Sequence, residues 1–230
     1  MKAAFLLFVF SPFLITSTLF AQEVTKKYDF KDFSEVGVIN GMHVSVTQSD
    51  SYDIEVTAEK EDLDNLKVWR KGDALNFYMS EESYNLRGKV NIKIKMPSLT
   101  AISLSEGAEG NIVMDVSSES FDAALSGGCE LNGELKCSNI NMSLSGGSEI
   151  TLKGKGEDAE IAGSGSSSFN LKEFSVRNVD SQLSGGSEVK ITMNGTLNTM
   201  QSGGSNFVYY GKAEMENTMF SDGSEVEKGE

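Results

Sequence analysis

Short runs in which apolar and polar residues alternate fill much of the chain, and from residue 105 onward these runs recur at a nearly constant spacing. Seven segments align on a leading serine and follow one another about every 19 residues. The leading residues are Ser105, Ser126, Ser145, Ser164, Ser184, Ser202 and Ser221. A fixed period of this length indicates a repeat architecture, in which each unit stacks on its neighbours.

Apolar side chains take the same places in each unit. One set follows the leading serine by five residues, at Leu131, Ile150, Phe169, Val189, Phe207 and Val226. A second set comes two residues later, at Leu152, Leu171, Ile191 and Tyr209. A third set directly precedes the serine, at Leu104, Leu125, Leu144, Leu183 and Phe220. A spacing of two residues puts side chains on one face of a β-strand, so each unit predicts two short strands whose apolar face only stacking can bury.

The segment between the two strands reads Ser-Gly-Gly-Ser-Glu in its clearest copies, such as Ser145 to Glu149. Its third position is glycine in every copy except one, where Ser166 stands, so we expect a positive φ or a crowded backbone there. The second position also accepts Glu106 and Asp222 and is expected to be less demanding. The fourth position predicts tight packing because it holds only small residues: Ala108, Cys129, Ser148, Ser167, Ser187, Ser205 and Ser224.

These features predict an all-β protein, a single-stranded parallel β-helix built from coils of about 19 residues. The glycine content and the lack of a 3.6-residue pattern exclude a helical solenoid. A propeller is disfavoured because each of its blades needs roughly 40 residues and four strands. A β-sandwich is the alternative, because short strands at even spacing also describe that class.

Residues 22–100 lack the repeat and predict an N-terminal β-rich capping part of the same domain, followed by the repeat coils of residues 101–230. Alternation at Val44 and Val46 indicates a strand, Glu59 to Leu66 favours a short helix, and Val90 to Met96 reads as a further strand. A solenoid needs an atypical first unit to cover its open apolar end, which is the role expected of this segment.

Residues 1–21 are typical of a signal peptide. Lys2 provides the basic start, an apolar run extends from Ala3 to Ile15, and Ala21 is the small residue before the expected cut. Pro12 helps to break the run, which is shorter than the roughly 20 apolar residues of a membrane anchor. We therefore expect export, no membrane span after signal cleavage, and a periplasmic, outer-membrane-associated or extracellular location.

Charge excludes one class of partner. The chain has 20 Lys and Arg against 34 Asp and Glu, a net charge of -14, and this surface would repel nucleic acid. Cys129 and Cys137 are its only cysteines. In an exported protein they can form a disulfide, or Cys129 can fill the small-residue position as a free thiol, and their spacing leaves both readings open.

No catalytic centre is evident in the sequence. His43 is the single histidine and lies in an alternating strand, which leaves one imidazole for any triad and removes sites built on histidine pairs. No nucleophile elbow, phosphate-binding loop or zinc-ligand spacing occurs. We therefore expect a protein that is not an enzyme, with no catalytic, cofactor-binding or metal-binding residues that a motif identifies. A polysaccharide-active enzyme is the less favoured option, resting on fold analogy and unspecific carboxylates.

The fifth repeat position is the one candidate for a functional cluster. Stacked coils would place its residues in one acidic column: Glu109, Glu130, Glu149, Ser168, Glu188, Asn206 and Glu225. Neighbouring carboxylates could share a cation such as Ca²⁺, although the glycine-rich motif of calcium-binding β-rolls is absent. The alternative is that the column is a solvated outer face that keeps the β-helix from pairing laterally, and this interpretation is favoured.

The run from Val90 to Leu99, followed by repeated Leu-Ser-Gly-Gly-Ser segments, resembles the bacterial family called putative auto-transporter adhesin head, GIN domain. The resemblance covers roughly residues 28 to 226. Gly37 to Gly41 stands where that family has its Gly-Ile-Asn region, although Val38 separates Gly37 from Ile39 here. The resemblance implies a right-handed parallel β-helix, export and an adhesive role, and it brings no catalytic residues.

Taken together, the sequence predicts an adhesin-like cell-surface or extracellular binding module for an unknown protein or glycan. An envelope-associated structural scaffold is the alternative. The exposed ends of a β-helix also make a homo-oligomer possible through end-to-end association.

Overall fold

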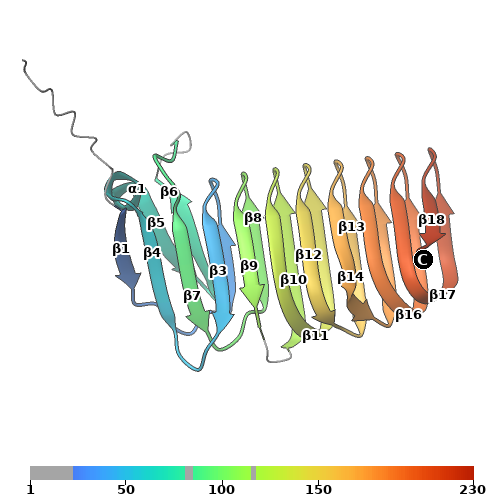
Figure 1. Ribbon diagram of the computed structural model, residues 1–230, viewed down its shortest axis with the longest axis horizontal. Coiled ribbons are helices and arrows are strands. Elements are labelled where there is room, and N and C mark those ends of the chain that lie inside the picture. Colours follow the sequence, from blue (N-terminus) through green and yellow to red (C-terminus); the bar gives the residue numbers. More distant parts are fainter. Residues whose placement is uncertain (1–22, 81–84, 115–117) are drawn as a thin grey trace, which may run out of the picture.

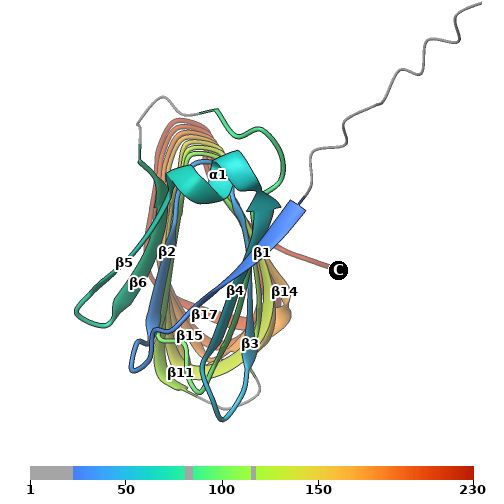
Figure 2. The ribbon, with the colours of Figure 1, turned by 90° about the vertical axis from the view of Figure 1, so that its left-hand side faces the viewer.

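The computed structural model describes residues 23–80, 85–114 and 118–230, and this part of the chain holds 18 strands and one six-residue helix (Figure 1). The signal-peptide prediction for residues 1–21 lies outside the described residues. Hydrogen bonds join all 18 strands into a single sheet. The sheet winds into a flattened coil with a front wall and a back wall, which meet in tight turns at the top and in bends at the bottom (Figures 1 and 2).

The front wall contains β1 (Glu23–Tyr28), β3 (His43–Gln48), β4 (Asp53–Glu59), β7 (Asn91–Met96), β9 (Glu109–Val113), β12 (Glu149–Lys155), β14 (Ser168–Val176) and β18 (Glu225–Lys228). The back wall contains β2 (Glu35–Val38), β5 (Leu66–Lys71), β6 (Ala74–Met79), β8 (Ala101–Ser105), β10 (Ser118–Ser126), β13 (Asp158–Gly163) and β15 (Asn178–Leu183). Three long strands run from the front wall through the bottom bend into the back wall: β11 (Glu130–Ser145), β16 (Glu188–Gln201) and β17 (Asn206–Phe220). The helix α1 (Lys60–Asn65) lies at the top of the N-terminal end (Figure 2).

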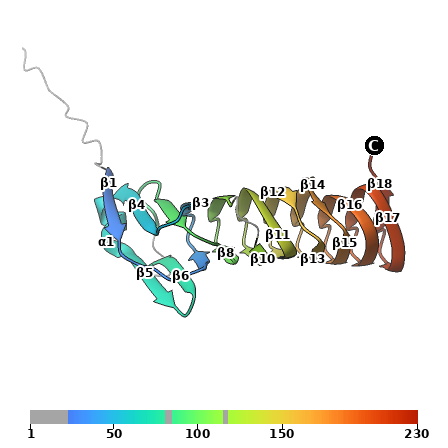
Figure 3. The ribbon, with the colours of Figure 1, turned by 90° about the horizontal axis from the view of Figure 1, so that it is seen from below.

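Equivalent positions of successive coils lie directly above one another. Leu125 pairs with Leu104 on one side and with Leu144 on the other, and Ile150 pairs in the same way with Leu131 and Phe169. All pairings between the repeat coils are parallel, and the coils follow one another along a single axis (Figure 3). The predicted parallel β-helix with coils of about 19 residues is confirmed, and the β-sandwich alternative is wrong.

In the repeat coils the predicted apolar columns form a large part of the core. Leu131, Ile150, Phe169, Val189 and Phe207 are at most 1% exposed. The column that precedes the leading serine is buried at Leu104, Leu125, Leu144 and Leu183, but Phe220 in the last coil is 46% exposed. Phe220 pairs with Gln201 of the coil before, and no further coil among the described residues stacks on its outer side. Its side chain therefore remains exposed.

The N-terminal segment expected to form the cap also builds coils of the same solenoid. Strands β2 and β3 pair in parallel with β8 and β9, and β6 and β7 pair in parallel with β2 and β3. After β1 at the outer end, the chain therefore runs inward to β2 and β3, moves outward to β4 and β5, and returns through β6 and β7 before β8 and β9 begin the repeats. Strands β1, β4 and β5 pair antiparallel at the outer end, and α1 forms within the helix-prone stretch.

The tight turns use left-handed backbone at two successive positions rather than one. Gly146 and Gly147 have φ of 66° and 74°, and the same pair of positive values occurs at Glu106 with Gly107 and at Asp222 with Gly223. The expectation that only the third position is special was therefore wrong. A Cβ at Gly203, a second position, would lie 2.9 Å from the backbone nitrogen of Gly185 in the coil before, whereas Gly204 meets only Asp222 O at 4.0 Å. Two successive left-handed residues are typical of a type I′ turn.

A serine or cysteine at the fourth position closes five of the seven turns. The hydroxyl of Ser187 donates to the carbonyl of Ser184 at 2.7 Å, and Ser167 makes the same bond to Ser164. Cys129 substitutes for serine here, with its Sγ 3.1 Å from the carbonyl oxygen of Ser126. These side chains are almost fully buried, so the bond satisfies polar groups that would otherwise lose their contact with water.

Both cysteines are free thiols and both are buried. Cys129 and Cys137 are 2% and 5% exposed. Burial raises the pKa of the Cys137 thiol to about 11, because the thiolate would lose its hydration. Of the two interpretations left open by the sequence, the structure therefore favours the free thiol.

The turn geometry predicts a difference between two adjacent glycines. Gly204→Ala should lower the free energy of unfolding by about 1–2 kcal/mol, the usual penalty for a side chain at positive φ. Gly203→Ala should lower it further, because its Cβ also presses on Gly185. Thermal melts of both variants test the order. Equal melting temperatures would contradict the proposed backbone contact between coils.

The cysteine environments predict slow alkylation. At pH 8 the Cys137 thiol should stay protonated and covered, since its pKa lies near 11 and only the thiolate is a good nucleophile. Iodoacetamide should therefore modify neither cysteine in the native protein and both in urea, as mass spectrometry can count. Rapid modification of Cys137 without denaturant would show that this wall opens readily.

Candidate functional site

The acidic column predicted from the repeat is present. Along the front wall, Glu130 pairs with Glu109 and with Glu149, and the parallel register continues to the last coil. Its further members are Ser168, Glu188, Asn206 and Glu225. The column also extends in the opposite direction, because His43 pairs with Glu109 on the far side from Glu130.

Members of the column bind neighbours rather than converge on a common point. The Nδ1 of His43 lies 2.8 Å from Oε2 of Glu109, and Lys190 Nζ lies 2.8 Å from Oε1 of Glu188. The amide of Asn132 donates to Glu130 at 2.6 Å. Within the described ranges, no group of three or more His, Cys, Asp or Glu side chains is arranged to hold a metal ion.

A groove of about 370 Å³ opens where this column meets the N-terminal coils. We call it the His43 groove. Four adjacent strands, β7, β3, β9 and β11, supply two parallel rows of outward side chains. The first row is Asn91, His43, Glu109 and Glu130, and the second is Lys93, Ser45, Asn111 and Asn132. Strand pairing fixes the spacing of the side chains within each row at roughly 4.8 Å.

Hydrogen-bonding capacity remains free in the groove. Glu109 holds the His43 ring through Nδ1, which leaves Nε2 available to a ligand. The side-chain amides of Asn91 and Asn111 have no hydrogen-bond partner within the described part of the chain. Each of these amides offers two donors and an acceptor. Together with the nearby ammonium group of Lys93, the groove presents donors and acceptors on a rigid β-sheet surface.

Sequence reasoning found the two glutamates of the groove but not the other members. His43 was assigned to a strand outside the repeats, with no relation to the acidic column. The missed signal was Asn40-Gly41, whose φ values of 65° and 66° match the second and third positions of the repeat turn. Aligning these two residues with the glycine pairs would have placed His43 at the fifth position, in line with Glu109.

A larger groove of about 620 Å³ runs along the back wall beside the turns of the last coils. Its lining includes Ala162, Gln182, Met200 and Met219, together with serines of the turns. None of the described residues that line it has an ionisable side chain. The His43 groove is the stronger candidate because binding sites combine a hollow with a few convergent polar groups.

Three solved structures of similar shape come from species of Bacteroides and Parabacteroides. A protein from Bacteroides fragilis described as a "putative adhesin" has a TM-score of 0.82 and 17% identity, and the match covers 90% of this chain and 97% of that one. A "putative adhesin" from Parabacteroides merdae has a TM-score of 0.75 and 16% identity, covering 91% and 97%. A "putative lipid binding protein" from Parabacteroides distasonis has a TM-score of 0.71 and 16% identity, covering 90% and 97%. At these identities the likeness establishes the fold alone.

No curated protein matches the sequence. The model of one family does, over residues 32–213, a range that begins before β2 and ends within β17 and so contains the whole His43 groove. The chain belongs to the family described as "Putative auto-transporter adhesin, head GIN domain".

Proposed function

We propose that the protein is an exported, non-enzymatic, adhesin-like binding module and that it binds a glycan in the His43 groove. The observation that supports this most is the pair of unpartnered amides, Asn91 and Asn111, beside the imidazole that Glu109 orients. Sugar hydroxyls both donate and accept hydrogen bonds, and a surface of amides, carboxylates and imidazole offers both partners at fixed spacing. A rigid scaffold also lowers the entropy lost on binding.

Binding without catalysis fits the placement of the carboxylates. Glycoside hydrolysis uses two carboxyl groups that flank the scissile bond. Glu109 and Glu130 stand next to each other in one row of a single sheet face, so they approach a bound chain from the same side. Both also carry partners already, His43 and Asn132.

Exposure at the cell surface or outside the cell is part of the proposal. It is supported by the signal-like sequence of residues 1–21 and by the adhesin description of the family. No helix in the described part of the chain is long and apolar enough to cross a membrane. Fractionation of cells that express the full sequence, with N-terminal sequencing of the exported product, tests this part directly.

The glycan proposal predicts weaker binding after loss of the free amides. Screening the purified protein on a glycan array should identify a ligand, and Asn111→Ala should then raise its Kd about five- to tenfold, equivalent to one hydrogen bond of roughly 1–1.5 kcal/mol. Asn91→Ala should have a similar effect.

Asn170→Ala is the matched control, because Asn170 lies in the same row two coils beyond Asn132, outside the groove. It should leave the Kd unchanged. Absence of binding across a broad array, or equal Kd values for the Asn111 and Asn170 variants, would contradict the proposal. Phospholipid vesicles belong in the same screen, and binding to vesicles alone would replace the glycan by a lipid.

A further inference from the structure

Exposed large apolar side chains gather at the two ends of the solenoid. Within the described residues they are Val24, Trp69, Val113, Met200, Met215, Met219 and Phe220. All but Val113 lie in β1 and β5 at the N-terminal end, or in β16 and β17 at the C-terminal end. Trp69 is 51% exposed and Met219 is 62% exposed. Neither residue lines the His43 groove, so their exposure belongs to a different surface. Concentrated apolar exposure of this kind marks an interaction surface.

Each end also presents unpaired strand edges. At the N-terminal end of the described chain the front wall stops at β1, and the back wall stops at β5 (Figure 2). Among these residues β1 pairs only with β4, and β5 pairs only with β6. At the C-terminal end β18 covers β17 only from Asn206 to Tyr209. The rest of β17 has no strand on its outer side among the described residues. Exposed edges of this length are templates for pairing with another chain.

The charges of the two ends are opposite on the back wall. On β5, Lys67, Arg70 and Lys71 have no carboxylate partner in the described ranges. Arg70 donates instead to backbone carbonyls, and the Lys71 ammonium lies 6.0 Å from the centre of the Trp69 ring. On β17, Glu214 and Glu216 are exposed and without an ion-pair partner in the same ranges.

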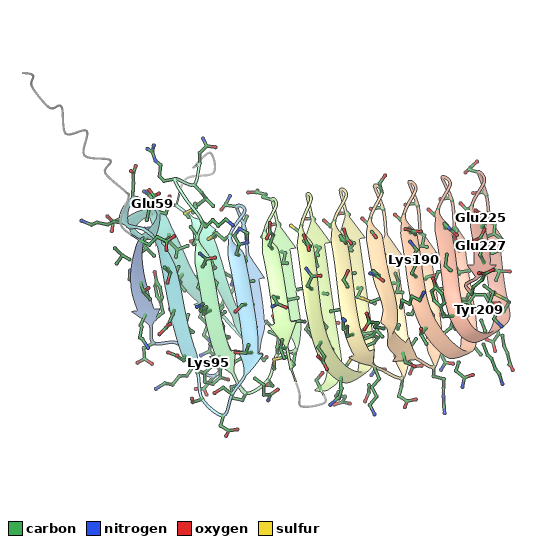
Figure 4. The ribbon with its side chains drawn as sticks, in the orientation of Figure 1. Glu59, Lys95, Lys190, Tyr209, Glu225 and Glu227 are labelled. Atoms are coloured by element: carbon green, nitrogen blue, oxygen red, sulfur yellow. The ribbon has the colours of Figure 1, made fainter. Side chains whose placement is uncertain are left out.

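The front wall repeats this arrangement more weakly. Glu225 and Glu227 project from β18 at the C-terminal end (Figure 4). On β1, Lys26 is exposed, whereas Lys27 already pairs with Glu55 at 2.7 Å and with Asp53 at 3.4 Å. The difference in charge between the two ends therefore lies mainly on β5 and β17.

We propose that the C-terminal end of one copy docks on the N-terminal end of the next, with the free edge of β17 pairing with β5. Because β5 runs antiparallel to β6 and the rest of the back wall is parallel, this new pair is antiparallel. With the turns of the two copies level, Trp69 then lies opposite Met219, and Lys71 lies beside Glu216. Lys67 and Glu214 add to the opposite charges of the two ends. Opposite charges across paired strands stabilise them, and like charges destabilise them.

The charge pattern favours this arrangement over a symmetric one. Two C-terminal ends would bring Glu214 and Glu216 of both copies together, and two N-terminal ends would bring together Lys67 and Lys71. A head-to-tail contact uses different surfaces on the two copies. Because these surfaces lie at opposite ends of a single axis, the chains can add indefinitely (Figure 3). The inference is independent of ligand binding in the His43 groove, which stays uncovered on the front wall.

Sedimentation velocity of the protein expressed from its full sequence tests the proposal. The average mass should rise with concentration beyond that of a dimer and fall when salt is added, because the contact relies on exposed charges. A monomer at every concentration, or a limit at the dimer, would overturn the proposal.

Charge reversal separates head-to-tail docking from its alternatives. The double variants K67E/K71E and E214K/E216K should each associate at least tenfold more weakly than the original protein. An equimolar mixture of the two should associate again, because every end then meets an end of opposite charge. Restored association in the mixture would support the head-to-tail contact, and a mixture that stays monomeric would contradict it.

A symmetric contact between C-terminal ends would leave K67E/K71E associating as before, which would also overturn the proposal. The control variant E160K/D180K makes the same charge change on exposed outward positions of the back wall, away from both ends. It should associate like the original protein. Circular dichroism and thermal melts of all variants establish that each is folded. The salt dependence of association is measured on the original protein, so this result does not depend on the folding of any variant.

Discussion

Hydrogen bonding between successive coils in parallel register, shifted only at bulges in three of the pairings, is the interaction on which the rest of this structure depends. It places each residue above the equivalent residue of the coil before, so every position has to tolerate a copy of itself at the strand spacing of roughly 4.8 Å. The apolar columns satisfy this requirement by packing into one core. The turns satisfy it with glycines whose backbones hydrogen-bond from coil to coil, as the N–H of Gly128 does to the carbonyl of Gly146 at 3.0 Å, and with buried serines that bond within their own turn. The motif is therefore a consequence of stacking rather than the signature of a chemical site.

The same register explains what could be predicted from the sequence. Period, core columns and fold class followed from the seven repeats because local spacing alone determines them. The turn was only partly predicted, since Glu106 and Asp222 at the second position suggested tolerance, although they adopt the same left-handed backbone as glycine.

The first coil was missed because Ile39 replaces the leading serine and Met42 replaces the small residue, so only Asn40-Gly41 still matched. In the groove, Glu109 and Glu130 came from the repeat, but Asn91 and Lys93 reach it through β7, which the chain inserts beside β3 after a long excursion. No sequence spacing could have indicated that neighbour.

The location of the groove follows from this insertion. A perfectly regular solenoid presents the same row of side chains in each coil, which gives a uniform surface. Where β7 joins the stack, residues of unrelated sequence continue the rows begun by the repeats, and amide, imidazole, ammonium and carboxylate groups come together on adjacent strands. The ends differ from both walls for a simpler reason: their outermost strands lack a partner, so apolar and charged groups that would be covered in a middle coil remain exposed.

Backbone contact between glycine turns has a further consequence for how such a protein can change over time. A contact made by main-chain atoms does not depend on which particular side chains flank it, so a segment of about 19 residues can be duplicated or lost without adjusting its neighbours. Each such event would move the C-terminal end by one strand spacing, roughly 4.8 Å, and leave the groove near the other end intact. The number of repeats therefore sets the length of the molecule: unequal recombination within the gene can change that length in fixed increments while the His43 groove stays the same.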